Sequence, residues 1–222
     1  MNAPPIKVSS MEERVKQERE SIQYLELDAQ LWKTLAALPP QDVCRRSLAS
    51  YDSNLQCYHV QVLNEPYQVY PGESCIHSTN NRGTALSIEL QLLILQYLVQ
   101  AKELPLAGKW VTEKELKNGE MFYRGVHSLA MFKNPLEEKF GRRPDHFLEA
   151  GPSIGGIKVD YGDVGLKFQA LPRIPVLLIL WAADDEFPAK VTILFDPTIE
   201  HHLALDTIWG LVRVITFKLL EF

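Results

Sequence analysis

Several features that define large classes of proteins are missing from this 222-residue sequence. No apolar run reaches the roughly 18 residues that a membrane-spanning helix needs, so we expect no membrane span. There are only three cysteines and no Cys-x-x-Cys pair, which argues against a disulfide framework and favours the reducing cytoplasm. The net charge is −5, and the basic pairs Arg45-Arg46 and Arg142-Arg143 are short. We therefore expect no nucleic acid partner and interpret both pairs as solvated surface.

Well-known catalytic and nucleotide-binding motifs are missing as well. The sequence contains neither the GxSxG element of serine hydrolases nor the HExxH element of zinc proteases. Residues 151–156 are rich in glycine, but they lack the Gly-Lys-Ser/Thr ending of a phosphate-binding loop and precede a predicted strand. No complete catalytic set can be assembled from the sequence.

Three segments of the chain differ in their pattern. Residues 1–10 are polar and contain prolines, which predicts a disordered tail. Residues 11–40 begin with alternating charges and continue with leucines at helical spacing, which predicts a charged N-terminal helix that ends at Pro39-Pro40. No linker rich in Gly, Ser or Pro divides residues 41–222, so we expect them to form a single α+β domain.

The predicted domain has a mostly antiparallel sheet of four to six strands, packed against a central and a C-terminal helix. Most strands are joined by short loops and must pair antiparallel, since parallel neighbours need long crossovers. The predicted strands are 56–63, 67–70, 156–159, 164–170, 176–181 and 189–195. Residues 85–101 are apolar on all sides, which predicts a buried helix, and 206–220 carry one apolar stripe. The polar residues 71–84 are predicted to form a loop.

A cluster of acids lies between the two most apolar predicted strands. Asp184, Asp185 and Glu186 concentrate carboxylates, which suit a hard cation or a cationic ligand. The same residue types are also typical of a solvated hairpin turn. Trp181 and Phe187 bracket the acids and are large enough to bury one carboxylate and raise its pKa. These five residues form the candidate cofactor-binding site.

Cys57, His59, Cys75 and His77 form the best candidate set of metal ligands. The members of each pair are two residues apart, so in an extended segment both side chains point to the same side. Cysteine and histidine are ligands of zinc and iron, and histidine is also an axial ligand of haem-like cofactors. The alternative is that they are ordinary loop and strand residues, because no known ligand spacing supports the set.

Asp196 and the adjacent histidines His201 and His202 are a further candidate. One histidine could form an acid–base pair with Asp196, whereas surface histidines near a turn are the alternative. Asp196-Pro197 itself is typical of a turn or a helix cap. In a hairpin built from the two apolar strands, Asp196 lies about 20 Å from the acids at the other end. The two groups therefore cannot share one metal ion.

The C-terminal half carries a series of short motifs that together resemble a prokaryotic family of unknown function. The motifs are Leu171-Pro172-Arg173-Ile174-Pro175, Trp181, Asp184-Asp185-Glu186-Phe187-Pro188 and Ile193-Leu194-Phe195-Asp196. The resemblance covers about residues 55–222. This sequence departs from the family pattern at 203–207, where it has Leu-Ala-Leu-Asp-Thr in place of an entry like Leu-Pro-Thr-Glu-Asp.

The resemblance implies no established activity. Members of the family are frequent in anaerobes with corrinoid and iron–sulfur metabolism, which implies a role in handling such a cofactor. Three functions stay open at this point. The first is an accessory or binding protein for a metal, a tetrapyrrole cofactor or a protein partner. The others are an enzyme that uses the acids at 184–186, and an interaction module that acts through the N-terminal helix.

Overall fold

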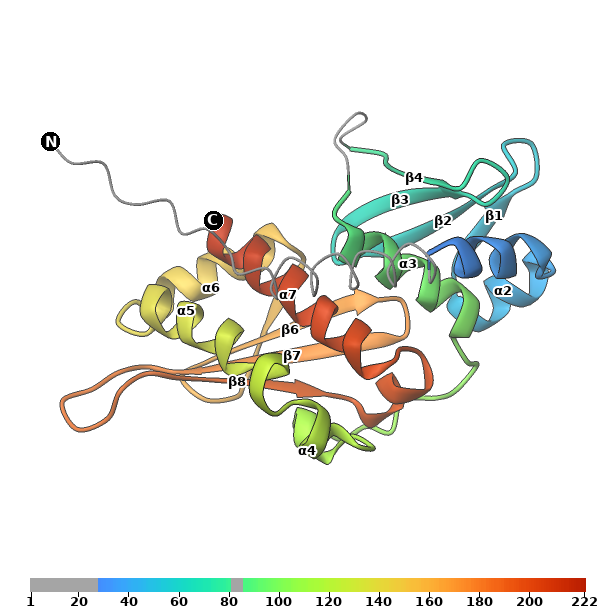
Figure 1. Cartoon of the computed structure of the whole chain (residues 1–222). Helices are drawn as coiled ribbons and strands as arrows, with labels where there is room; N and C mark the ends of the chain where they lie inside the picture. The colour runs from blue at the N-terminus through green and yellow to red at the C-terminus, as the bar shows by residue number, and fades with distance from the viewer. Residues whose placement is uncertain (1–27, 81–85) are drawn as a thin grey trace, which may run out of the picture.

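Two antiparallel sheets and the helices packed on them make up the fold (Figure 1). The computed structural model describes residues 28–80 and 86–222 of the chain. The strand orders are β1-β2-β3-β4 and β5-β6-β7-β8, and every pairing within these sheets is antiparallel. The prediction of an α+β protein with antiparallel strands is confirmed. The strands form two sheets of four, and the helices between residues 88 and 153 lie between the two sheets in sequence.

The N-terminal half consists of one sheet and two helices that follow a first helical segment. Residues 28–37 are helical, and Leu31, Trp32 and Leu35 are buried, so this part of the predicted N-terminal helix belongs to the fold. The rest of that predicted helix, 11–27, and the predicted tail lie outside the described residues. The following elements are α2 Pro40–Ser47, β1 Ser50–Asp52, β2 Cys57–Val62, β3 Glu65–Tyr70, β4 Cys75–Ser78 and α3 Ile88–Gln100.

Strand β4 lies within the predicted loop, so that prediction is wrong for residues 75–78. The strand has four residues, and only Ile76 and Ser78 are buried. Its pairing with β3 joins Gln68 to His77 and Val69 to Ile76. The strand is formed by hydrogen bonding to a neighbour, and its own sequence carries too little apolar periodicity to reveal it.

The C-terminal half contains the second sheet and the remaining helices. Its elements are η1 Glu113–Glu115, α4 Gly119–Phe122, η2 Gly125–His127, α5 Ala130–Phe140, α6 Pro144–Ser153, β5 Gly156–Val159, β6 Val164–Leu171, β7 Ile174–Trp181, β8 Lys190–Phe195, η3 Pro197–His201 and α7 Leu205–Glu221. Helices α3 and α7 pack against each other. The predicted central helix is confirmed, because residues 93–95, 97 and 98 are fully buried.

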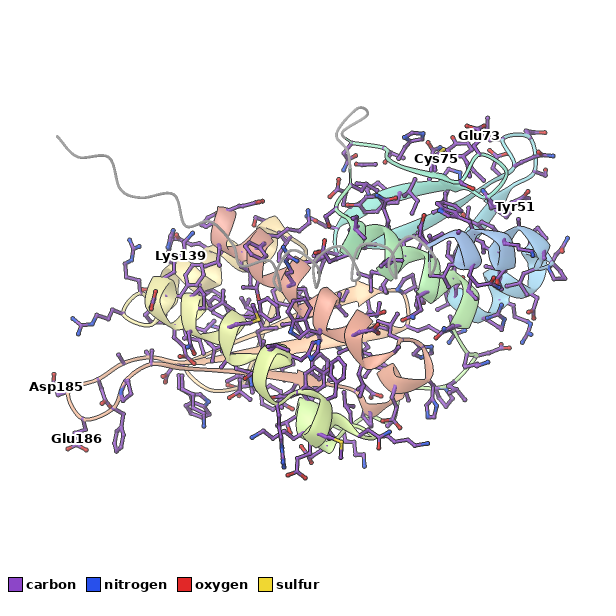
Figure 2. All side chains as sticks on the ribbon, viewed as in Figure 1. Tyr51, Glu73, Cys75, Lys139, Asp185 and Glu186 are labelled. Carbon is purple, nitrogen blue, oxygen red and sulfur yellow. The ribbon has the colours of Figure 1, made fainter. Side chains whose placement is uncertain are left out.

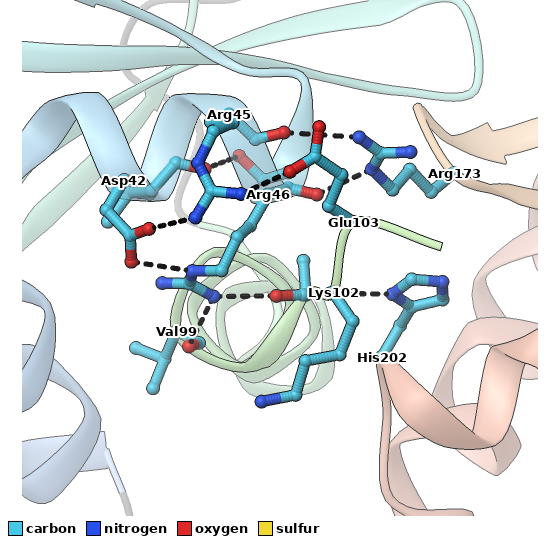
Figure 3. A network of polar contacts seen from close by, with 11 residues as sticks. Asp42, Arg45, Arg46, Val99, Lys102, Glu103, Arg173 and His202 are labelled. Carbon is cyan, nitrogen blue, oxygen red and sulfur yellow. Dashed lines mark hydrogen bonds and ion pairs between the residues drawn. The ribbon is translucent and has the colours of Figure 1, made fainter. Parts of the chain in front are cut away.

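A series of arginine contacts joins the two halves (Figure 3). Arg173, in the β6–β7 turn, donates hydrogen bonds to the carbonyl oxygens of Arg46 at 2.6 Å and Arg45 at 3.1 Å, at the end of α2. Arg46 in turn donates to the carbonyl oxygens of Ala101 at 2.6 Å and Val99 at 3.1 Å, at the end of α3. Guanidinium groups at these positions satisfy terminal carbonyls and oppose the helix dipoles.

No helix in the described parts of the chain is long and apolar enough to cross a membrane.

Candidate functional site

The connection between β7 and β8 is a hairpin extension that projects from the body of the protein (Figure 1). We call residues 182–189 the arm. The ladder of strand pairs ends at Trp181 and Lys190, just before the arm begins. Asp185 and Glu186 lie at its far end (Figure 2). The arm therefore carries the acids that the sequence marked as a candidate site.

The base of the arm is fixed to its surroundings by hydrogen bonds. The amide of Ala183 donates to the carbonyl oxygen of Gly141 at 2.8 Å, and the amide of Ala182 donates to Asp163 Oδ2 at 2.7 Å. A Cβ atom on Gly141 would lie 2.3 Å from the Cβ of Ala189, so only glycine allows this approach. These contacts hold the arm in one direction relative to helix α5.

A tight turn closes the arm around Asp184. Its Oδ1 accepts the amides of Phe187 at 2.6 Å and Glu186 at 2.8 Å, and its own amide donates to the carbonyl oxygen of Phe187 at 3.0 Å. The hydrogen bonds from Phe187 and Glu186 lower the pKa of Asp184. The expectation of a raised pKa is therefore wrong for this residue, because the aromatic side chains leave it exposed while backbone amides stabilise its charged form.

Two aromatic side chains of the arm region are open to solvent. Trp181 is 49% exposed and Phe187 is 66% exposed. Both line a hollow of about 670 Å³, together with Glu137, Asp163 and Asp184. This side of the arm thus combines aromatic rings with three carboxylates and one lysine, Lys190, and we call it the acidic side.

A second surface beside the arm carries a group of basic residues. A second hollow of about 680 Å³ lies between the arm and the end of α5. Its lining includes three basic residues, Lys139, Arg142 and Arg143, together with two glutamates, and both arginines are exposed. Figure 2 shows Lys139 at the same end of the molecule as the tip of the arm. We call these three residues the basic surface.

No sequence pattern connects the basic surface with the arm. Arg142 and Arg143 form a two-residue basic pair, which has no specific pattern and is interpreted from the sequence as solvated surface. The arginines at 142–143 and the acids at 184–186 are far apart in the sequence, so no local pattern links the two groups. Only the contact between Gly141 and the arm brings the two groups together.

The four predicted metal ligands share one face of the N-terminal sheet but stand in two pairs. Gln68 of β3 pairs with His59 on one side and with His77 on the other. Strands β2 and β4 are therefore two strand spacings apart, roughly 9.5 Å. Within the first pair, Cys57 Sγ and His59 Nε2 are 3.6 Å apart.

The strand spacing also argues against a disulfide bond between Cys57 and Cys75. Their strands are separated by more than the 7 Å or so that a disulfide can span between Cα atoms. Burial raises the pKa of both thiols. Within residues 28–80 and 86–222, no group of three or more His, Cys, Asp and Glu residues is arranged to hold a metal ion. The metal site stays a prediction.

Asp196 is buried and caps η3, as its sequence context predicted. Its carboxylate accepts the amides of Gly108 at 2.9 Å, Thr198 at 3.0 Å and Ala107 at 3.1 Å, and the Thr198 hydroxyl at 2.7 Å. Burial alone raises its pKa, but these hydrogen bonds outweigh burial and lower it. The carboxylate ties the loop after α3 to the end of β8.

His202 is fully buried, and its burial makes the free energy of unfolding depend on pH. Its Nδ1 accepts the amide of Lys102 at 3.2 Å, while Nε2 has no partner among the described residues (Figure 3). Burial, the charge of Arg173 and that of His201 lower the pKa of His202 from 6.5 to about 4. The folded protein therefore keeps this imidazole neutral in weak acid.

Acidification from pH 7 to pH 5 is expected to lower the free energy of unfolding by about 1 to 2 kcal/mol through His202. The unfolded chain gains a proton on this side chain below its ordinary pKa, whereas the folded chain resists protonation until about pH 4. Urea unfolding at both pH values measures the effect. His202→Asn retains an acceptor for Lys102 but cannot titrate, so an equal loss of stability in this variant would contradict the assignment.

The fold and the arm together define an α+β domain with a projecting, charged hairpin. Residues 39–218 match a family described as a domain of unknown function (DUF3786), and the chain belongs to this family. No curated protein and no solved structure matches the chain. The expected membership in a family of unknown function is confirmed at this level, while the motif series and its occurrence in anaerobes stay predictions.

Proposed function

We propose that this protein is an accessory protein that acts by binding another protein through the arm. The observation that carries the proposal is the exposure of Trp181 and Phe187 on a hairpin whose base is fixed by hydrogen bonds. Aromatic residues are enriched at the centres of protein interfaces, and charged residues are tolerated at their rims. The arm has this arrangement, with two aromatic side chains bordered by carboxylates.

The hydrogen bonds that fix the arm favour a role in binding a partner. Hydrogen bonds to Gly141 and Asp163 hold its base, and the Asp184 turn closes its tip. A partner that binds this hairpin has little chain entropy to remove. The lowered pKa of Asp184 keeps its carboxylate charged at neutral pH, which suits it to building and charging the turn more than to exchanging protons.

A photoreactive residue at position 187 is expected to form one discrete covalent adduct in cells of the native host. A benzophenone side chain in place of Phe187 lies where the partner would contact the arm. The matched control is the same replacement at Phe217, which is 49% exposed on α7 and lies outside the arm. Excess unmodified protein should compete the adduct away. Equal adducts at both positions, or none at position 187, would contradict the proposal.

The other functions considered from the sequence stay predictions. They are a metal or tetrapyrrole site that uses Cys57, His59, Cys75 and His77, a cofactor site that uses Trp181, Asp184, Asp185, Glu186 and Phe187, and an enzyme that uses the acids at 184–186. An interaction through the N-terminal helix falls largely on residues outside the described part of the chain.

A further inference from the structure

We infer that the partner bound by the arm is a second copy of this chain. The acidic tip of each arm would lie on the basic surface of the other copy, so that the contact occurs twice. This inference rests on the proposed function, because it names the partner of the same site. It is carried by the acids at the tip of the arm (Figure 2), by the arginines beside its base, and by the absence of ion pairs to these side chains within the described residues.

The acids at the tip and the arginines of the basic surface form no ion pair within residues 28–80 and 86–222. Among the described residues, Asp185, Glu186, Arg142 and Arg143 take part in none of the ion pairs. All four residues are exposed. Lys139 donates only to a backbone carbonyl oxygen at the end of α7, at 2.6 Å. Two carboxylates and two guanidinium groups are thus free to pair with another molecule.

The arrangement of these charges fits two-fold symmetry. In a two-fold dimer, a group at one position on the first copy contacts a second position on its partner, and the reverse contact follows automatically. A surface that carries both an acidic and a basic part, side by side, is complementary to itself when rotated. The arm meets this condition because its tip carries Asp185 and Glu186 (Figure 2), while Arg142 and Arg143 line the hollow beside its base.

The exposed aromatic residues supply the apolar contact that charges alone do not. A stable interface buries about 1,200 Å² or more, and solvent-exposed ion pairs add little free energy each. Trp181 and Phe187 lie at the base and near the tip of the arm. In the dimer they would be covered by the partner copy, with the ion pairs at the rim to set orientation and association rate.

Sedimentation velocity of the 222-residue chain is expected to show a dimer that dissociates as the salt concentration rises. Two variants with reversed charges should each be monomeric, with self-association weakened more than about thirtyfold. The first is Asp185→Lys with Glu186→Lys, and the second is Arg142→Glu with Arg143→Glu. Asp184 is left unchanged because it builds the turn. Circular dichroism and thermal unfolding establish that both variants are folded.

Charge exchange between the two variants provides the decisive comparison. An equimolar mixture should form a heterodimer. In it, the reversed arm of the first variant meets the reversed basic surface of the second, and the native arm of the second meets the native basic surface of the first. The chain that carries all four substitutions should recover the homodimer. The inference would be overturned if the wild-type protein were a monomer. It would also be overturned if either charge-reversed variant alone formed dimers as stable as those of the wild type.

The two proposals can fail separately. If the wild-type protein is a monomer but the adduct at position 187 contains a different protein, the second-copy inference fails and the binding function stands. If the wild-type protein is a monomer and no adduct forms at position 187, both fail. An adduct with twice the mass of the chain, together with recovery by charge exchange, supports both.

Discussion

Replacing Asp196 by alanine is expected to lower the free energy of unfolding by about 4 kcal/mol. The carboxylate is buried and accepts four hydrogen bonds from three residues, Ala107, Gly108 and Thr198. Alanine leaves these donors without an acceptor at a site that is partly open to water, because Ala107 and Gly108 are exposed and Thr198 is half-buried. Hydrogen bonds to charged groups are the stronger kind, and unsatisfied buried donors carry a further desolvation cost. Urea unfolding followed by circular dichroism measures the loss.

Asp196→Asn is the matched control for this prediction. It preserves the shape of the side chain and one acceptor oxygen, but it removes the charge and places an NH₂ group near backbone amides. We expect a stability between those of the wild type and Asp196→Ala. An alanine variant as stable as the wild-type protein would show that the loop at residues 107–108 reorganises without cost, and would contradict the structural role of Asp196.

Replacing Arg173 by alanine is expected to lower the free energy of unfolding by about 3 kcal/mol. The guanidinium group donates to the carbonyl oxygens of Arg45 and Arg46, and so connects the β6–β7 turn to the end of α2 (Figure 3). Its loss leaves terminal helix carbonyls without a donor and removes a cation from the negative end of the helix dipole. Chemical denaturation at neutral pH measures this change.

Arg45→Ala controls for a change of charge in the same region. The Arg45 guanidinium is exposed and pairs with Asp42 and Glu103 at the surface. Ion pairs of this kind contribute little to stability. We therefore expect the denaturation midpoint of this variant to stay close to that of the wild type. Equal losses in the Arg173 and Arg45 variants would mean that surface charge is responsible and that the capping contacts are not.

These predictions divide the C-terminal motifs by physical role. Arg173 and Asp196 are engaged in hydrogen bonds that join distant parts of the fold. Asp184 builds the turn at the end of the arm, whereas Asp185 and Glu186 have no such task in the described structure. Substitutions at Arg173 and Asp196 should therefore affect folding, while those at Asp185 and Glu186 should affect association.

The amino-acid sequence by itself determined the secondary structure wherever a local apolar pattern was strong. The apolar residues of 176–181 and 189–195 predicted β7 and β8, and the all-round apolar character of 85–101 predicted the buried helix α3. For the acids at 184–186, the sequence allowed a hairpin turn as the alternative to a site for a cation. All of these properties depend on neighbours within a few residues, which is why they can be read without a structure.

Only the tertiary structure decided which of the candidate residues lie together. Cys57 and Cys75 occupy the same face of a sheet, but β3 separates their strands, and the edge strand β4 had no local signal. Asp196 binds the amide of Gly108, which is 88 residues away in sequence. The basic surface meets the arm because Gly141 has no side chain to hold Ala189 at a distance. Such contacts are set by chain topology and close packing, and no pattern within a short segment contains them.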